Sequence, residues 1–337
     1  MSGPMRFFAA ATLLPVALIA AGALAGGVWP WLALGYMTVF TAAADRLIAR
    51  TLPTAPPEAE FPVADALSAV LALAQFALLA LTVRALATGI AGVPLFLAMA
   101  LFAGQVGNSN AHELIHRGSR LLRGLGMWAY VSVLFGHHTS AHVLVHHIRV
   151  ATRGDPNSAR PGESLYRFIP RAWRGSFREG FRAESERLAR VGRPWWRHPY
   201  VTYLGGAVLM LVLAALIGGW RGLAWYVPLA LFAQAQLLMS DYVQHYGLAR
   251  ALRPDGKPEP VAPRHSWNSP HPASSALMLN APRHSDHHGH PTRPYPALEL
   301  PPDAPMLPRS LPVMATLALV PPLWRRVMDP RAARWRG

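Results

Sequence analysis

The 337-residue sequence contains no cysteine. This absence excludes disulfides, cysteine-ligated zinc, iron–sulfur clusters and a cysteine nucleophile. Any bound metal would depend on histidine, carboxylate or water ligands. Charged residues are also scarce, at 15% of the chain against about 25% in a typical soluble domain. Because 52% of the residues are hydrophobic, the composition is typical of a membrane protein with a substantial polar part.

The charge that is present has one dominant sign. The formal net charge is +15, and almost all of it comes from arginine. The arginines cluster between apolar runs, as the positive-inside rule describes, and no nucleic-acid recognition motif accompanies them. We therefore expect no nucleic-acid partner, whereas an acidic protein or anionic lipid headgroups would suit these arginines.

Six apolar runs predict six transmembrane helices, because about 20 apolar residues suffice to cross a bilayer. They cover residues 7–28, 29–48, 63–87, 92–106, 200–220 and 223–243. The first resembles a signal peptide, but it is too long and a second run follows at once. The arginine-rich segments predict that both termini and the polar segments 107–199 and 244–337 lie in the cytoplasm. The expected fold is thus one all-α integral-membrane domain over residues 1–337.

Three further segments carry weaker signals. Residues 121–136 are apolar but short and contain Arg123, which favours an interfacial or buried helix. Residues 161–197 alternate arginine with aromatic and aliphatic side chains, typical of a basic amphipathic helix on a membrane surface. Residues 311–323 are apolar but too short to span, and two prolines interrupt them.

The histidines form three clusters that predict a metal centre. The first, HELIH at residues 112–116, matches the HExxH pattern, and alone it would indicate a zinc protease with Glu113 as general base. The second is HVLVHH at 142–147, and the third is HSDHH at 284–288. Each has histidines four apart, which face the same side of a helix. Neighbouring histidines point about 100° apart and therefore suit two different ions.

The number of histidines argues against a single zinc ion, which takes three or four protein ligands. With His245 at the end of the sixth run, nine candidates are available, enough for two ions. An ionisable pair formed by Asp241 and His245 at the membrane edge is also costly unless it is functional. His137 and His138 could be outer partners or substitute ligands, and we expect outer or solvent-facing roles for four others, His198, His265, His271 and His290. Two ions in a histidine cage beside an apolar scaffold favour oxygen chemistry on apolar substrates, and hence iron.

Taken together, the motifs resemble those of the integral-membrane alkane monooxygenases, within the membrane fatty-acid desaturase and hydroxylase superfamily. The three histidine clusters are shared across that superfamily. Narrower features point to the alkane branch, and they are DYVQHYGL at 241–248, HSWNS at 265–269, RHSDHH at 283–288, VAT at 150–152 with Asp155-Pro156, and ALVPPLW at 318–324.

The resemblance implies a six-helix fold with a cytoplasmic non-haem di-iron site. It implies that oxygen and two electrons hydroxylate a terminal methyl group, with the electrons passed from an NAD(P)H-dependent reductase through rubredoxin, a small acidic protein. No side-chain acid or base is assigned. The implied iron ligands are nine histidines: His112, His116, His142, His146, His147, His245, His284, His287 and His288.

The sequence departs from the family pattern at three positions. Ala141 and Gln244 stand where the family has glutamate, and Val145 stands where it has glycine. Carboxylates near a metal orient its histidine ligands, so these changes bear on substrate and rate more than on metal binding. Alternatives to alkane hydroxylation are oxidation of a methyl group on an aromatic ring, desaturation or hydroxylation of membrane lipid, and, more distantly, zinc proteolysis or non-catalytic metal binding.

Overall fold

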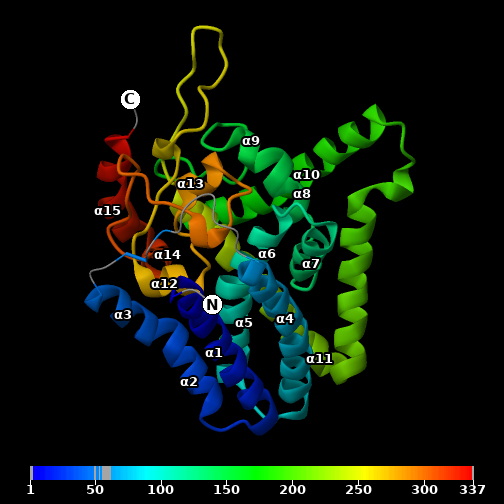
Figure 1. Ribbon diagram of the computed structural model, residues 1–337. Coiled ribbons are helices and arrows are strands. Elements are labelled where there is room, and N and C mark those ends of the chain that lie inside the picture. The colour runs from blue at the N-terminus through cyan, green and yellow to red at the C-terminus, as the bar shows by residue number, and fades with distance from the viewer. Residues whose placement is uncertain (1–2, 49–50, 53, 55–61, 336–337) are drawn as a thin grey trace.

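The computed structural model describes residues 3–48, 51–52, 54 and 62–335, and this part of the chain is all helical apart from loops and two isolated β-bridges (Figure 1). The predicted all-α class is confirmed. The helices are α1 (Gly3–Ala25), α2 (Trp29–Gly35), α3 (Thr41–Leu47), α4 (Pro62–Thr88), α5 (Val93–Phe102), α6 (Asn108–Ile115), α7 (Arg120–Val131), α8 (His138–Ala141), α9 (His147–Arg149), α10 (Leu165–Arg190), α11 (Pro199–His245), α12 (Pro272–Leu277), α13 (His284–Gly289), α14 (Leu311–Ala318) and α15 (Pro321–Ala333). Three π-helical turns, η1 (Tyr36–Phe40), η2 (Ala103–Gly107) and η3 (His142–His146), and three 3-10 turns, η4 (Trp195–Arg197), η5 (Pro263–His265) and η6 (Tyr295–Ala297), complete the order.

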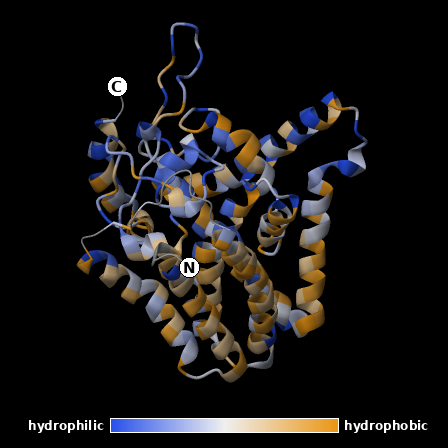
Figure 2. Ribbon diagram, in the orientation of Figure 1, coloured by the Kyte–Doolittle hydropathy of each residue, from blue (hydrophilic) through white to orange (hydrophobic). Residues whose placement is uncertain are grey.

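Three of the described helices are long and apolar enough to cross a membrane: Met5–Ala25 within α1, α4, and α11. The predicted runs 200–220 and 223–243 are the two arms of α11. The helix breaks at Gly219, one residue before the predicted end of the first run, and the φ of 58° at Gly219 is a left-handed conformation that glycine adopts without strain. Figure 2 shows that the apolar helices gather in the lower half of the view and the hydrophilic segments in the upper half.

The predicted runs 29–48 and 92–106 correspond to composite helices. One is formed by α2, η1 and α3, and the other by α5, η2 and α6, each without a break in the helical path. The second continues to Ile115, well beyond the predicted end at 106. Its added turns contain Asn108 and Asn110, whose side-chain amides donate to the carbonyls of Ala233 in α11 and Ser68 in α4 at 2.9 and 2.8 Å. These bonds satisfy buried polar groups, so the helix can run on through a polar segment.

The remaining helices depart from the predictions mainly at their ends. α7 begins one residue before the predicted 121–136 helix and ends early, at Val131. α10 is the basic amphipathic helix predicted over 161–197. In the 311–323 run the prolines separate two helices, because Pro321 and Pro322 start α15. Proline is favoured in the first turn of a helix, where its missing N–H needs no partner.

The packing brings the polar ends of the apolar helices together. α4 packs against α1 and α11, α2 against α5, and α6 against α7. The C-terminal ends of α6 and α11 carry the first histidine cluster and His245. η3 and α9 supply the second cluster, and α13 supplies the third.

Candidate metal centre

The second histidine cluster lies in a π-helical turn. In η3 the backbone N–H of His147 donates to the carbonyl of His142, five residues earlier. A π turn is wider than an α turn and is frequent at functional sites. It aligns residues five apart, so His142 faces the same way as His147 rather than His146. The Nε2 atoms of His142 and His147 lie 2.9 Å apart.

The nine predicted histidines lie together and divide into two groups. Within each group, one ring nitrogen per histidine lies within 4.8 Å of all the others. The five-histidine group contains His112, His116, His142, His147 and His287, and the four-histidine group contains His146, His245, His284 and His288. The groups are adjacent, since the ring centroids of His147 and His288 are 4.6 Å apart. Neighbours in sequence thus separate between the groups, as predicted for two ions.

The nitrogen atoms are spaced as metal ligands would be. Within the groups, the Nε2 atoms of His147 and His287 are 3.1 Å apart, and those of His245 and His284 are 2.9 Å apart. Metal–imidazole bonds of about 2.0–2.1 Å place ligands separated by 90–110° about 2.9–3.4 Å apart. Buried Nε2 atoms of His112, His116 and His146 have no hydrogen-bond partner among the described residues. The donor set therefore fits two metal ions.

For five of these histidines the surroundings favour the neutral ring, which is the form that binds metal. Burial, followed by the charges of neighbouring histidines, holds the pKa of His142, His147, His284, His287 and His288 well below the usual value. A neutral imidazole has a free lone pair to donate to a cation.

Asp155 is a carboxylate at this site whose role the sequence did not reveal. Its Oδ2 accepts from Nδ1 of His146 at 2.8 Å, and both residues are buried. Burial acts to raise the pKa of Asp155, but His146, the hydroxyl of Ser158 and the backbone N–H of Asn157 lower it on balance. The ionised carboxylate fixes the ring so that Nε2 of His146 points into the four-histidine group. The sequence showed Asp155 only as part of a motif, and no spacing rule links it to His146.

The third cluster is held by a separate set of contacts. Asp286 accepts from the guanidinium of Arg293 at 2.7 Å and from the backbone N–H of Glu299 at 2.9 Å. The N–H of Ser285 donates to Asn268 at 2.9 Å. Arg283 is 2% exposed and donates to the carbonyls of Leu52 and Leu298. The short helix α13 is thereby fixed although it has only six residues.

Glu113, the general base of the protease interpretation, is occupied elsewhere. Its carboxylate pairs with Arg117 at 2.6 Å and accepts from the backbone N–H of Tyr295 at 3.0 Å. It therefore joins α6 to η6. This structural role gives no support to proteolysis.

The other six histidines lie outside the two groups. His137 faces α10, 3.4 Å from the hydroxyl of Ser176 and edge-on to Trp173. Four others form hydrogen bonds with nearby side chains: His198 with Ser185, His265 with Glu259, His271 with Ser269, and His290 with Asp286. His138 instead lines a cavity beside the five-histidine group.

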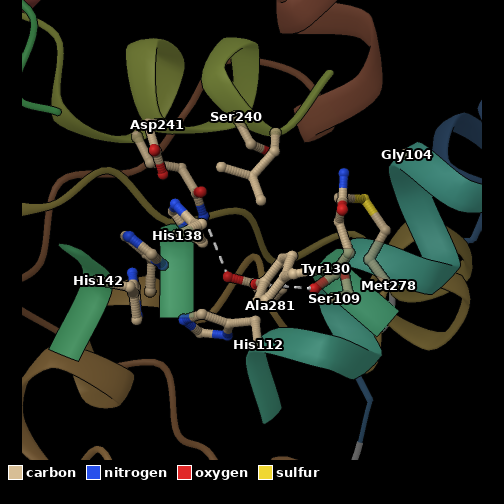
Figure 3. Close-up of a pocket in the computed structure, with 14 residues that line it drawn as sticks. Gly104, Ser109, His112, Tyr130, His138, His142, Ser240, Asp241, Met278 and Ala281 are labelled. Atoms are coloured by element: carbon tan, nitrogen blue, oxygen red, sulfur yellow. Dashed lines mark hydrogen bonds between the residues drawn. The ribbon is translucent and has the colours of Figure 1, made fainter. Parts of the chain in front are cut away.

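That reaction cavity, of about 50 Å³, lies between α6, α8, η3 and α11 (Figure 3). His112, His138 and His142 form one side of it, and Met278 and Gly104 the other, with Ser240 and Asp241 of α11 above (Figure 3). Its volume suits a small molecule or one end of a chain, since a water molecule takes about 30 Å³ in the liquid.

A second, larger cavity of about 420 Å³ adjoins the first. The two share Gly104, Ser240 and Met278 in their walls. Most of its lining is apolar and comes from η1, α5, α11 and α14, including Met37, Leu101, Phe232, Met239 and Leu311. An apolar compartment thus adjoins a smaller cavity beside the histidines.

The three positions that differ from the family pattern, 141, 145 and 244, are all buried. Ala141 is buried close to the α10 backbone at Gly180, so a larger side chain there would meet α10. Gln244 donates from Nε2 to the carbonyl of Ala281 at 3.0 Å and lines the reaction cavity. Val145 is buried inside η3. None of the three belongs to either histidine group.

Comparison with known proteins agrees with the motifs. The fatty acid desaturase family matches residues 88–312. Alkane 1-monooxygenase 2 of Pseudomonas aeruginosa is 33% identical over 317 residues, 90% of this chain and 84% of that protein. Alkane 1-monooxygenase 1 of the same organism is 38% identical over 242 residues, 70% and 62% of the two chains.

The xylene/toluene monooxygenase hydroxylase component of Pseudomonas putida is 31% identical over 234 residues, 67% of this chain and 60% of that protein. The chain therefore spans most of the first relative but less than two thirds of the other two. Both the family match and the first relative extend over more than half of the chain. The chain belongs to the fatty acid desaturase family and, within it, to the alkane monooxygenases, which are oxidoreductases.

Proposed function

We propose that this protein hydroxylates a terminal methyl group of an alkane. The balanced reaction converts R–CH3, O2, two electrons and two protons into R–CH2OH and water. The observation that carries the proposal is the arrangement of the cavities: an apolar compartment adjoins a small one bounded by His112, His142 and His284. An alkane chain would be held in the larger compartment with its end beside the histidines.

The nine histidines are the proposed ligands, five for one iron and four for the other. When bound, the two irons would supply the redox chemistry with oxygen. The protein's own contribution is placement and exclusion of water. Asp155 orients His146, burial favours the neutral form of most of the other rings, and the apolar lining keeps bulk water away from the reacting carbon.

The electron donor we propose is rubredoxin, reduced by an NAD(P)H-dependent reductase. α10 supports an acidic partner because it presents exposed arginines, among them Arg174, Arg178 and Arg182, on the same polar half of the molecule as the histidines. The same charge supports six spans with this half in the cytoplasm of a bacterial cell.

The topology can be tested because the chain has no cysteine of its own. Ile90→Cys lies in an exposed loop at the expected outer end, and Arg178→Cys lies on exposed α10. A membrane-impermeant maleimide should label the cysteine at 90 in intact spheroplasts and the one at 178 only after permeabilisation. The reverse pattern would contradict the proposed orientation.

The reaction is tested by product analysis. Cells expressing the chain with a rubredoxin and its reductase are fed octane, hexadecane and p-xylene in parallel. Primary alcohol from either alkane would support the proposal and give its chain-length range. Metal analysis of the purified chain should find about two irons, whereas zinc alone would contradict the ligand assignment and revive proteolysis.

A second candidate is oxidation of a methyl group on an aromatic ring, and the 31% identity to the xylene/toluene enzyme component favours it over more distant alternatives. Benzylic alcohol alone would select it. Without any of these products from a chain holding two irons, membrane lipid would become the expected substrate for desaturation or hydroxylation.

A further inference from the structure

His138 is a buried histidine in the reaction cavity that neither histidine group includes. It starts α8, is 2% exposed and lines the cavity with His112, His142 and Tyr130. Its ring stacks on Phe135, with centroids 5.2 Å apart and an angle of 11° between the planes. Figure 3 shows it on the same side of the cavity as His112 and His142.

The ring is held by aromatic packing rather than by hydrogen bonds. Tyr130 meets it edge-on at 5.0 Å, and its buried Nδ1 has no hydrogen-bond partner among the described residues. Buried polar nitrogens are almost always paired, because an unpaired one loses its bond to water without replacement. The partner of His138 is therefore expected to be a molecule that enters the cavity.

The preceding histidine shows that this placement is specific. His137 points out of the cavity toward α10, where Ser176, Trp173 and Phe177 surround it. Two neighbouring residues of the same type thus have different surroundings. His137→Phe is for this reason a matched control for a change at 138.

The chemistry of the proposed reaction limits which molecule could form a hydrogen bond with His138. An alkane has no atom that can accept or donate a hydrogen bond, whereas the primary alcohol formed from it has a hydroxyl at the reacting end. A neutral imidazole offers one N–H and one lone pair, and a hydroxyl can use either. We propose that His138 hydrogen-bonds the hydroxyl of the primary alcohol product and so distinguishes alcohol from alkane in the reaction cavity. This assignment rests on the proposed function.

The test measures binding rather than turnover. The full-length iron-loaded protein in detergent is titrated with 8,8,8-trifluoro-1-octanol and with 1,1,1-trifluorooctane, and dissociation constants are taken from fluorine NMR. His138→Phe keeps a flat ring against Phe135 but removes both nitrogens. It should weaken alcohol binding about 3- to 10-fold, the range expected for one neutral hydrogen bond, and leave alkane binding within about twofold.

Two further variants separate this role from others. His137→Phe should leave both constants unchanged, and His138→Gln, which retains a donor and an acceptor, should recover part of the alcohol binding. Equal effects of His138→Phe on both probes would overturn the proposal in favour of a packing role. Loss of iron in that variant would overturn it in favour of a metal ligand.

The same titration distinguishes a failure of the proposed function from a failure of the His138 assignment. If the unchanged chain binds neither probe, alkane hydroxylation is refuted and the assignment of His138 falls with it. If the chain binds both but His138→Phe alters neither constant, only the assignment of His138 is refuted. In that case water is the expected partner of the ring.

Discussion

Replacement of Asp155 by asparagine tests how the protein holds its metal. The carboxylate accepts from Nδ1 of His146 at 2.8 Å, with 2% and 1% exposure of the two residues. The variant keeps the size of the side chain but removes the negative charge that orients the ring. Loss of such an outer partner costs about 10- to 100-fold in metal affinity, equivalent to about 1.4–2.7 kcal/mol.

The effect should be confined to one ion, because Asp155 contacts only the four-histidine group. The purified protein is exposed to increasing concentrations of an iron chelator, and the iron left per chain is measured. Asp155→Asn should release one iron at a chelator concentration at least about tenfold lower than the unchanged chain requires. The second iron should leave at the usual concentration.

Asp45→Asn provides the matched control. Asp45 is also buried, at 6% exposure, but it accepts from the backbone N–H groups of Ala273 and Ser274 and contacts no histidine of either group. The Asp45→Asn variant should release both irons at the same chelator concentrations as the unchanged chain. Simultaneous early loss of both irons from Asp155→Asn, or no early loss, would refute the separate roles of the two groups.

Three other changes have expected outcomes. His287→Ala removes a proposed ligand in the five-histidine group, so activity should fall more than about 100-fold while the chain stays in the membrane fraction. Full activity would refute the ligand assignment. Gly104 lies in the wall that the two cavities share, and even a Cβ there would overlap the Gln236 amide. Gly104→Val should therefore lower hydroxylation of hexadecane more than that of octane, and an unchanged ratio would argue against movement of substrate between the cavities. Gln244→Glu replaces the amide that donates to the Ala281 carbonyl with a carboxylate, which has no hydrogen to donate. The free energy of unfolding, measured by denaturant titration, should fall by about 1–3 kcal/mol. Equal stability would contradict a hydrogen bond between Gln244 and Ala281.

The set of histidines that lie together could be predicted from the sequence, and so could the separation of sequence neighbours, but the pairing within the second cluster could not. Histidine spacing selected the clusters, since histidines four apart share a face of an α-helix. His112 and His116 follow that rule, and so do His284 and His288. In the second cluster the π turn instead pairs His142 with His147, and the sequence carries no local signal for the extra residue in that turn.

The fold was predictable where one apolar run corresponds to one helix, as in α1 and α4. It was less so where tertiary contacts decide the helix end. The composite helix of α5, η2 and α6 continues past residue 106 because the side-chain amides of Asn108 and Asn110 donate hydrogen bonds to carbonyls of α11 and α4. Those partners are 125 and 42 residues away in sequence, too far for a pattern in a short window to reveal them.

The absence of glutamate at positions 141 and 244 is easier to understand from the packing than from the motifs. The helix before the second cluster is fixed by a carboxylate from another element: Ser140 donates to buried Glu184 of α10 at 2.7 Å and also contacts the hydroxyl of Tyr203 at 2.7 Å. At position 244 the amide serves as a donor to Ala281, which a carboxylate could not do. Near the histidines, Asp155 supplies the negative charge that orients a ring. The packing thus suits the residues present at 141 and 244, while the carboxylate that orients a histidine ring, Asp155, belongs to a motif that this chain shares with the family.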